Sequence, residues 1–209
     1  MDMVAQSGFL TAASTGVLIL VALVVLLASV CARADEADDT KYLIFWSAPE
    51  KAAELAEQVG MKGDGRTRIL GFGTPTSTFE LEGELDARIR RAFAAAVKND
   101  MALMLHYDFH YFWKSRPDLW NWFDPDQPGY DLKNKLNVEW HGWDGPPSKV
   151  RYLNWGVLER IPPHMCFTSE QVRAEITRIV STIIAPAVLE EVEKLKAVGK
   201  EQLLSLIHI

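Results

Sequence analysis

The sequence predicts an α/β fold, and three observations support this class. Short apolar runs with strand character alternate with amphipathic helical segments through most of the 209 residues. Gly and Pro stand where those strands and helices should end. Hydrophobic residues make up 48% of the chain and charged residues 24%, as in an ordinary globular domain. Such strand–helix–strand alternation is typical of βαβ units that form a parallel sheet.

The first predicted elements are a strand and a helix. Residues 42–46, YLIFW, form a short apolar run with strand character. Residues 51–60, KAAELAEQVG, predict a helix that Pro49 opens and Gly60 closes.

A second strand is predicted at residues 66–72, RTRILGF. We expect it to end in the group Gly71, Gly73 and Pro75, because glycine lets a backbone turn sharply or approach a ligand closely. The spacing does not match the GxGxxG fingerprint of a dinucleotide site.

The clearest helix is predicted at residues 84–98, where apolar residues recur every three to four positions. These are Leu85, Ile89, Ala92, Phe93 and Ala96. A short apolar strand, residues 101–105, follows and leads into a long segment rich in Pro, Gly, Asn and Asp. Within that segment, residues 150–153 predict a further strand.

A last long helix begins at a cap formed by Thr168 or Ser169. We expect Pro186 to kink or split it, and the helical pattern to continue to about Leu204.

The amino-terminal segment predicts export. Residues 16–30 are an apolar run shorter than the roughly 20 residues of a membrane-spanning helix. The small-x-small triplet 32–34 and an acidic stretch follow, which is the layout of a secretory signal peptide. The segment before the run has Asp2 and no basic residue, so an uncleaved anchor, or a lipoprotein using Cys31, are alternatives. We therefore expect a secreted or periplasmic protein that contacts a membrane only through this segment, if at all.

Three regions are predicted: a signal peptide at 1–34, a domain portion at 35–204 and an artefactual tail at 205–209. The closing string LSLIHI resembles translated sequencing-adapter read-through, which suggests a gene fragment. Cleavage would leave Cys166 as a lone cysteine, expected to be a small buried hydrophobe.

The charge balance argues against nucleic acid as a partner. The chain carries 22 basic and 28 acidic residues, a formal net charge of -6, whereas nucleic-acid binding needs a basic surface.

Aromatic residues are concentrated in the segment 106–155, which we call the aromatic loop. It holds six of the seven Trp and 13 of the 21 aromatic residues: Tyr107, Phe109, Tyr111, Phe112, Trp113, Trp120, Trp122, Phe123, Tyr130, Trp140, Trp143, Tyr152 and Trp155. Carboxylate, amide and imidazole groups lie between them. Aromatic faces with polar groups beside them match both surfaces of a sugar ring, so a carbohydrate is the predicted partner. The alternative is that most of these rings pack the loop internally, since Trp is usually largely buried.

Two carboxylates are candidates for catalysis. Asp108 directly follows a predicted strand, and Glu139 lies in a possible strand end between Val138 and Trp140. Glycoside cleavage needs two carboxyl groups, one as acid and one as base or nucleophile. The alternative for Glu139 is an ionised group that accepts loop hydrogen bonds.

A metal site is a rival prediction. In an extended segment His106, Asp108 and His110 share one face, with His141 as a possible fourth ligand. The HxDxH pattern occurs often by chance, so no metal and no other cofactor is assigned.

Three strings carry a family resemblance: RPDLWNWFDPDQPGY at 116–130, NVEWHGW at 137–143 and YLNWG at 152–156. They resemble a set of exported bacterial proteins similar to TIM-barrel glycoside hydrolases of the retaining, β-galactosidase-like clan. The resemblance covers about residues 42–204 and implies the first part of a (β/α)8 barrel, whose full form takes about 250 residues.

The resemblance implies that Asp108 and Glu139 lie at the barrel mouth, where they bind substrate, while the main catalytic glutamate belongs to a later strand. Implied substrate-binding residues are His106, Trp113, Asn121, Trp122, Trp140, His141, Asn154 and Trp155. The predicted function is that of a glycoside hydrolase-like protein acting on β-linked glycans, present as an incomplete fragment. The alternatives are a non-catalytic carbohydrate-binding or surface protein, and a metal-dependent hydrolase built on His106, Asp108 and His110.

Overall fold

The computed structural model describes residues 40–109, 113–154 and 158–208. The described residues from Lys41 onward form one compact unit. The predicted signal segment lies outside the described residues. Among the helices in the described ranges, none combines the length and apolar character needed to cross a bilayer.

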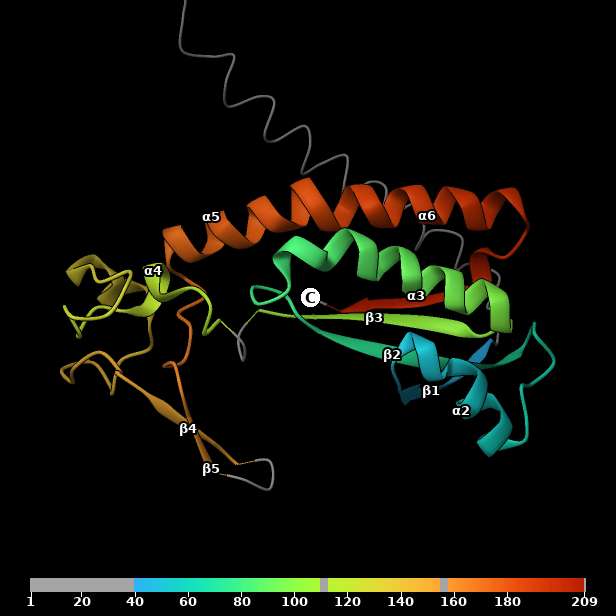
Figure 1. Ribbon diagram of the computed structural model, residues 1–209, viewed down its shortest axis with the longest axis horizontal. Coiled ribbons are helices and arrows are strands. Elements are labelled where there is room, and N and C mark those ends of the chain that lie inside the picture. Colours follow the sequence, from blue (N-terminus) through green and yellow to red (C-terminus); the bar gives the residue numbers. More distant parts are fainter. Residues whose placement is uncertain (1–39, 110–112, 155–157, 209) are drawn as a thin grey trace, which may run out of the picture. The chain divides into compact units, whose positions relative to one another are not determined.

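The compact unit is built on a four-stranded sheet in which every pair of neighbours is parallel. Its strands are β1 (Lys41–Trp46), β2 (Arg68–Ser77), β3 (Ala102–Asp108) and β6 (Leu204–His208). They lie side by side in the order β1-β2-β3-β6, which is also their order along the chain (Figure 1). The predicted α/β class with a parallel sheet is therefore confirmed.

Helices connect the strands. They are α2 (Ala52–Val59), α3 (Leu85–Asn99), α5 (Glu170–Ile179) and α6 (Ala185–Ala197), with single helical turns η1 (Pro49–Lys51), η2 (Glu82–Glu84) and η5 (Glu201–Leu203). Both early helices follow the prediction. Gly60 ends α2 with a left-handed φ of 70°, and the five apolar positions predicted for α3 are all buried.

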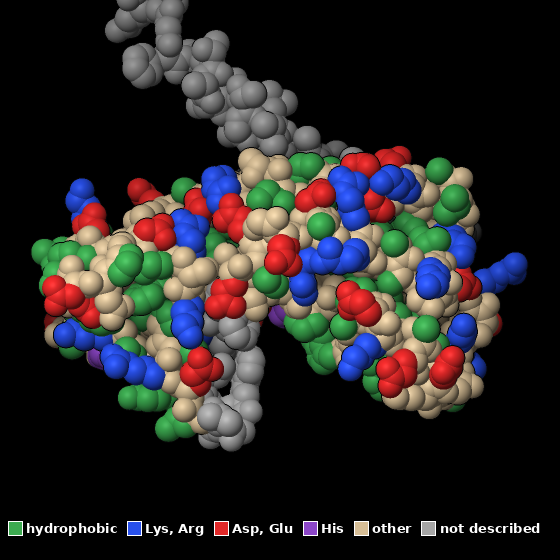
Figure 2. Space-filling model, in the orientation of Figure 1, with side chains coloured by type: hydrophobic (Ala, Val, Ile, Leu, Met, Phe, Trp, Pro, Cys, Tyr) green, Lys and Arg blue, Asp and Glu red, His purple; other side chains and the backbone are tan. Residues whose placement is uncertain are grey.

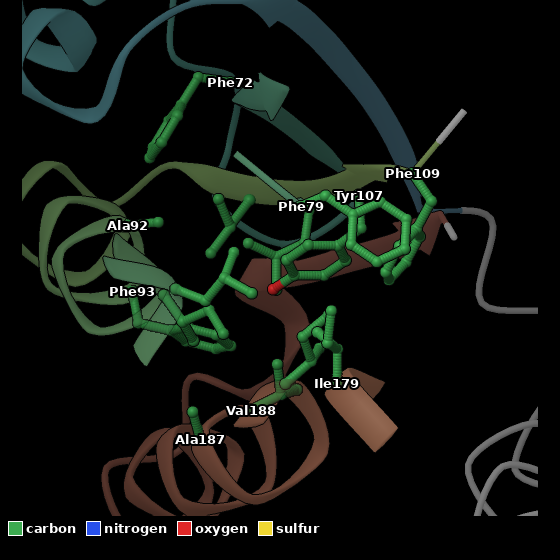
Figure 3. Close-up of a cluster of buried hydrophobic side chains, with 14 of the residues drawn as sticks. Phe72, Phe79, Ala92, Phe93, Tyr107, Phe109, Ile179, Ala187 and Val188 are labelled. Atoms are coloured by element: carbon green, nitrogen blue, oxygen red, sulfur yellow. The ribbon is translucent and has the colours of Figure 1, made fainter. Parts of the chain in front are cut away.

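The main core lies on one face of the sheet. Leu70 and Phe72 of β2 and Leu103 and Leu105 of β3 belong to one buried cluster with residues from all four of these helices. Figure 3 shows Phe72, Phe93 of α3 and residues of α6 contributing to this cluster. Because the helices share one cluster with the same strand faces, they cover the same side of the sheet. Over α5 and α6, acidic and basic side chains intermingle on the outer surface (Figure 2).

On the opposite face of the sheet, β2 contributes two glycines against which side chains of the neighbouring strands pack. A Cβ atom on Gly71 would stand 2.3 Å from Ile44 Cδ1 and 2.6 Å from the Ala102 carbonyl oxygen. On Gly73 it would stand 2.7 Å from Met104 Cε. Both glycines therefore lie inside β2, and the expectation that they end the strand is wrong. Because glycine has no side chain, the side chains of Ile44 and Met104 on the neighbouring strands can pack over Gly71 and Gly73.

Pro75 also lies inside β2 rather than after it. The last residue pair between β1 and β2 joins Trp46 to Gly73, so Pro75 faces an edge where β1 has already ended. Its missing N–H costs no ladder hydrogen bond there, which is why a proline is tolerated within this strand.

The helical segment before β6 is split as predicted. Ser169 caps α5, because its Oγ accepts a hydrogen bond from the Val172 N–H. A π-helical turn, η4 (Val180–Ile184), separates α5 from α6 just before Pro186. Proline cannot donate to the helix ladder, and a local widening of the helix accommodates that loss.

The end of that helix differs from the prediction. Helix α6 stops at Ala197, Gly199 adopts a left-handed φ of 65°, and the chain then turns into β6. The expected helix to Leu204 is therefore wrong, since the glycine ends it first. The segment assigned to an artefactual tail extends the sheet as β6, paired with β3.

The first three residues of the aromatic loop belong to β3, and the part of it described beyond Asp108 contains little regular structure. Its elements are α4 (Pro117–Trp120), η3 (Leu132–Asn137) and β4 (Arg151–Asn154), and β4 pairs antiparallel with β5 (Leu158–Ile161) just beyond it. Trp113, Leu119 and Val138 belong to the same buried cluster as the sheet. The loop therefore shares the main core instead of forming a separate one.

An ion-pair network joins the loop to α5. Glu175 of α5 accepts hydrogen bonds from Arg116 of the loop at 2.5 Å and from Arg178 at 2.8 Å. Arg178 also reaches Glu82 at 2.6 Å. Hydrogen bonds from Arg178, opposed by partial burial and helped by Arg116, lower the pKa of Glu175 to about 2.

This network predicts an acid-sensitive stability. A carboxyl group whose pKa is lowered in the folded state stabilises the fold above its unfolded pKa, and that stabilisation is lost as the pH falls toward the folded pKa. We expect Glu175 to contribute on the order of 2 kcal/mol at pH 7, and most of this to disappear between about pH 4.5 and pH 2. Urea unfolding of the chain and of Glu175→Gln across this range measures it. Equal stability differences between the two proteins at pH 7 and pH 2.5 would contradict the assignment.

Candidate functional site

Chemically active side chains meet at the carboxyl ends of β1 and β3. Trp46 is the last residue of β1, and His106 and Asp108 lie in the last three residues of β3. Asp108 pairs in register with Ser77, the last residue of β2. The carboxyl edge of a parallel sheet is where ligands bind in α/β proteins.

Trp46 and His106 are in direct contact. Their ring centroids are 5.4 Å apart with planes at 85°, an edge-to-face arrangement. Trp46 remains 60% exposed, so one side of the indole is open to solvent. The His106 ring also lies against His208, with 2.8 Å between their Nδ1 atoms.

His106 is held toward its neutral form. Burial lowers the pKa of His106 below its usual value, and His208 lowers it further, while Asp108 acts in the opposite direction. A neutral imidazole can accept a hydrogen bond as well as donate one. The pair His106 and Asp108 therefore offers both donors and acceptors beside an exposed aromatic face.

Trp46 was missed by the sequence analysis, which placed all candidate aromatics in the aromatic loop. A signal was present, since the apolar run 42–46 ends in a tryptophan where a strand was predicted to stop. The missing information was the strand order, which brings the end of β1 beside the end of β3 across the short side chains of β2.

Two predicted substrate-binding residues instead build the loop. Trp113 is fully buried, and its indole N–H donates to the Pro163 carbonyl at 3.0 Å. Asn121 is also fully buried, and its amide donates to backbone carbonyls of Asp124, Gln127 and Pro128. Neither side chain has surface left for a sugar, so the structure corrects both assignments.

Trp120 and Trp122 are half-buried and are also held by the loop. Their indole N–H groups donate to the carbonyls of Trp113 and Ser148, each at 3.0 Å. Lys149 lies over the Trp122 ring, with its Nζ 5.5 Å from the ring centroid. The face of Trp122 is thus occupied by a cation from its own chain, which weakens its case as a sugar platform.

Two asparagines that the sequence analysis did not single out for this role hold the loop together. Asn137 is 1% exposed; its amide donates to the Leu119 carbonyl and to Gln171 of α5, and its oxygen accepts from Ser169. Asn134 donates to the carbonyls of Asn121 and Gly129. A buried amide can satisfy several backbone groups at once, which a loop without a regular ladder requires.

The remaining loop candidates lie at the surface. Glu139 is exposed, and its backbone bonds to His164 and Ser148 fix the chain there, so it is not at a strand end as expected. Trp140 is 44% exposed with its N–H bound to the Lys135 carbonyl, and His141 is exposed. Trp143, which was not among the predicted site residues, is fully exposed.

Glu139 has a different neighbour from Asp108. It acts electrostatically on His164, whose ring nitrogen lies 3.2 Å from Arg151 Nη1. Burial, helped by Arg151 and opposed by Glu139, lowers the pKa of His164 below its usual range. Asp108, by contrast, acts on His106. The two predicted carboxylates, Asp108 and Glu139, therefore act electrostatically on two different histidines.

Some predicted residues fall outside the described ranges. His110 and Trp155 are among them, and only the backbone of Asn154, the last residue of β4, is described. Within the described ranges no group of three or more His, Cys, Asp or Glu residues is placed to hold a metal ion. Cys166 is only partly buried, with its Sγ 3.1 Å from Thr168 Oγ1, which corrects the expectation of a buried thiol.

An open cavity of about 340 Å³ adjoins Trp46, and we call it the Trp46 cavity. Its walls are the segment 46–50, Thr74 and Pro75 of β2, and Arg88 and Arg91 of α3. The volume falls at the lower end of the roughly 300–1,000 Å³ typical of small-molecule sites. Trp46 lines this cavity and also contacts His106 edge to face.

Comparison with known proteins adds no relative. No family model, no curated protein and no solved structure matches this chain.

Proposed function

We propose that this chain is the amino-terminal part of an exported (β/α)8-barrel protein of the glycoside hydrolase type that binds β-linked glycans. The single observation that carries the proposal is the exposed Trp46 indole, set beside His106 and Asp108 at the carboxyl edge of a parallel sheet. An aromatic face with adjacent polar groups suits the apolar face and hydroxyl edge of a sugar ring.

The strand order and the position of the helices support a barrel portion. Strands β1, β2 and β3 follow one another in space as they do in the chain, and the helices pack on one face only. A doubly wound sheet reverses its strand order and carries helices on both faces, whereas a barrel keeps one order and places its helices outside. In this proposal the other face of the sheet, which carries Ile44, Gly71 and Gly73, is the side that would line the barrel interior.

Binding is better supported than hydrolysis. Glycoside cleavage needs two carboxyl groups on either side of one bond, about 5–9.5 Å apart. In the described ranges Asp108 acts on His106 and Glu139 acts on His164, and no contact between the two carboxylates supports such a pair. This favours the second candidate for the chain itself, a carbohydrate-binding function without turnover.

Titration of the full chain with the neutral oligosaccharide cellotetraose, followed by calorimetry, tests the proposal. We expect binding, no release of reducing sugar, and a loss of about tenfold or more in affinity for Trp46→Ala, because an aromatic platform typically contributes over 1 kcal/mol. Tyr130→Ala, which removes an exposed ring from the aromatic loop, serves as the control and should bind like the parent chain.

Two results would overturn this proposal. One is the absence of binding to cellotetraose and to a second β-linked probe, xylotetraose, by a chain whose circular dichroism shows it to be folded. The other is equal loss of affinity in the Tyr130→Ala control, which would place the platform in the loop instead of at the sheet edge.

A further inference from the structure

The walls of the Trp46 cavity carry an excess of positive charge. Arg88 and Arg91 lie three residues apart on α3 and therefore on the same side of that helix. Among the described lining residues, Glu50 supplies the one carboxylate. Two guanidinium groups against one carboxylate leave one positive charge unmatched at the cavity wall.

Arg90, on the same helix, differs from Arg88 and Arg91 because it forms ion pairs with carboxylates. Arg90 binds Asp86 of its own helix and Glu190 and Glu191 of α6 at 2.8–3.1 Å. No ion pair of that kind joins Arg88 or Arg91 to a carboxylate within the described ranges, and Arg88 Nε is buried without a hydrogen-bond partner there. The cavity arginines therefore keep donors available to an incoming anion.

Arg88 is held in position by its surroundings. It lines the Trp46 cavity and also a small void of about 10 Å³ between α3 and the sheet, together with Thr76 and Tyr107. The side chain is thus enclosed by α3 on one side and β2 and β3 on the other. A guanidinium restrained in this way loses less conformational freedom when it binds a ligand.

We propose that the Trp46 cavity binds an acidic sugar, a uronic acid residue of a β-linked glycan, with its carboxylate on Arg88 and Arg91 and its ring on Trp46. This inference rests on the proposed function and narrows its substrate class. Guanidinium groups recognise carboxylates through paired hydrogen bonds, and an indole covers the apolar face of a sugar. A singly charged ligand also matches the single unmatched charge of the wall, whereas a phosphate dianion would bring a second negative charge toward Glu50.

The experiment compares two probes that differ only at C6, methyl β-D-glucuronide and methyl β-D-glucoside. Both are titrated into the full chain while the indole N–H resonance of Trp46 is followed by NMR. We expect the glucuronide to bind about tenfold more tightly, the effect of one charge-assisted interaction. We also expect its affinity, unlike that of the glucoside, to fall as sodium chloride is raised from 50 to 500 mM.

Three variants locate the preference. Arg91→Gln changes an exposed side chain, so the fold should persist, and we expect it to bring the two probes to similar affinities. Arg173→Gln is the matched control, an exposed arginine on α5 outside the cavity, and it should keep the tenfold preference. Trp46→Ala lacks the indole resonance, so its binding is measured by calorimetry, and we expect the variant to weaken both probes together.

The outcomes separate this inference from the proposed function. Equal affinities of the parent chain for both probes, with binding still dependent on Trp46, would overturn the acidic preference and leave the proposed function in place. Binding of sodium phosphate or acetate as tight as that of the glucuronide would show a plain anion site and overturn the sugar assignment. Failure of the glucoside, the glucuronide and cellotetraose alike would overturn both proposals.

Discussion

Replacing Phe93 by alanine should reduce the free energy of unfolding by about 3–5 kcal/mol, the usual cost of removing a fully enclosed phenylalanine. Phe93 is 2% exposed on α3, and it belongs to the cluster in which the strands meet α3 and α6 (Figure 3). Truncation removes the ring from water-free surroundings and leaves a cavity that packed helices cannot readily close. Since domains are stable by only about 5–15 kcal/mol, the variant should be close to unfolding at 37 °C.

Urea denaturation followed by circular dichroism measures this change. The matched control is Val97→Ala, one turn further along the same helix but 38% exposed, for which we expect a change below about 1 kcal/mol. A loss below 1 kcal/mol for Phe93→Ala would show that this part of the core is loosely packed. It would also remove the argument that the helices form one layer on one face of the sheet.

Replacing Asn137 by alanine should cost about 2–4 kcal/mol through a different mechanism. The change deprives the Leu119 carbonyl of a partner in a buried setting, which costs about 1–3 kcal/mol, and it also removes the partly buried bonds to Gln171 and Ser169. Because Asn137 joins the aromatic loop to the start of α5, the damage should concentrate in the loop. We expect the loop to open at lower urea concentration than the sheet.

Limited proteolysis and tryptophan fluorescence measured side by side test this expectation. Cleavage within residues 121–150 should accelerate in the variant, while far-ultraviolet circular dichroism of the sheet and helices is largely kept. Asn99→Ala is the control, since its amide binds only the Ala95 carbonyl within α3 and should leave the loop intact. Uniform unfolding of loop and sheet in Asn137→Ala would indicate that the two form a single cooperative unit.

The helices could be predicted because their signals are local. The apolar spacing of α3, the glycine after α2 and the serine before α5 each act within a few residues, and the structure confirms all three. The α/β class followed from the same local patterns. The end of α6 was missed because the periodic pattern runs on past Ala197, and only Gly199 marks the stop.

The strand ends and most site residues depend on contacts between distant parts of the chain. Gly71 and Gly73 look like strand breakers in the sequence, yet they lie within β2 because neighbouring strands bring Ile44, Ala102 and Met104 against them. The direction of an indole is equally non-local. Trp113 turns inward because the Pro163 carbonyl, 50 residues away, accepts its N–H. Neither the strand contacts nor the direction of Trp113 tests the prediction of a carbohydrate ligand, which stays a proposal.

The aromatic loop divides its residues between two tasks, and this division has a consequence for engineering. The side chains of Trp113, Asn121 and Asn137 are buried and bind backbone carbonyls, whereas those of His141 and Trp143 are exposed. Substitutions at these exposed positions can therefore be combined into libraries with little loss of yield. Exposed positions of the loop can be varied to select for binding of new ligands, while the buried asparagine side chains that hold the loop together are kept unchanged.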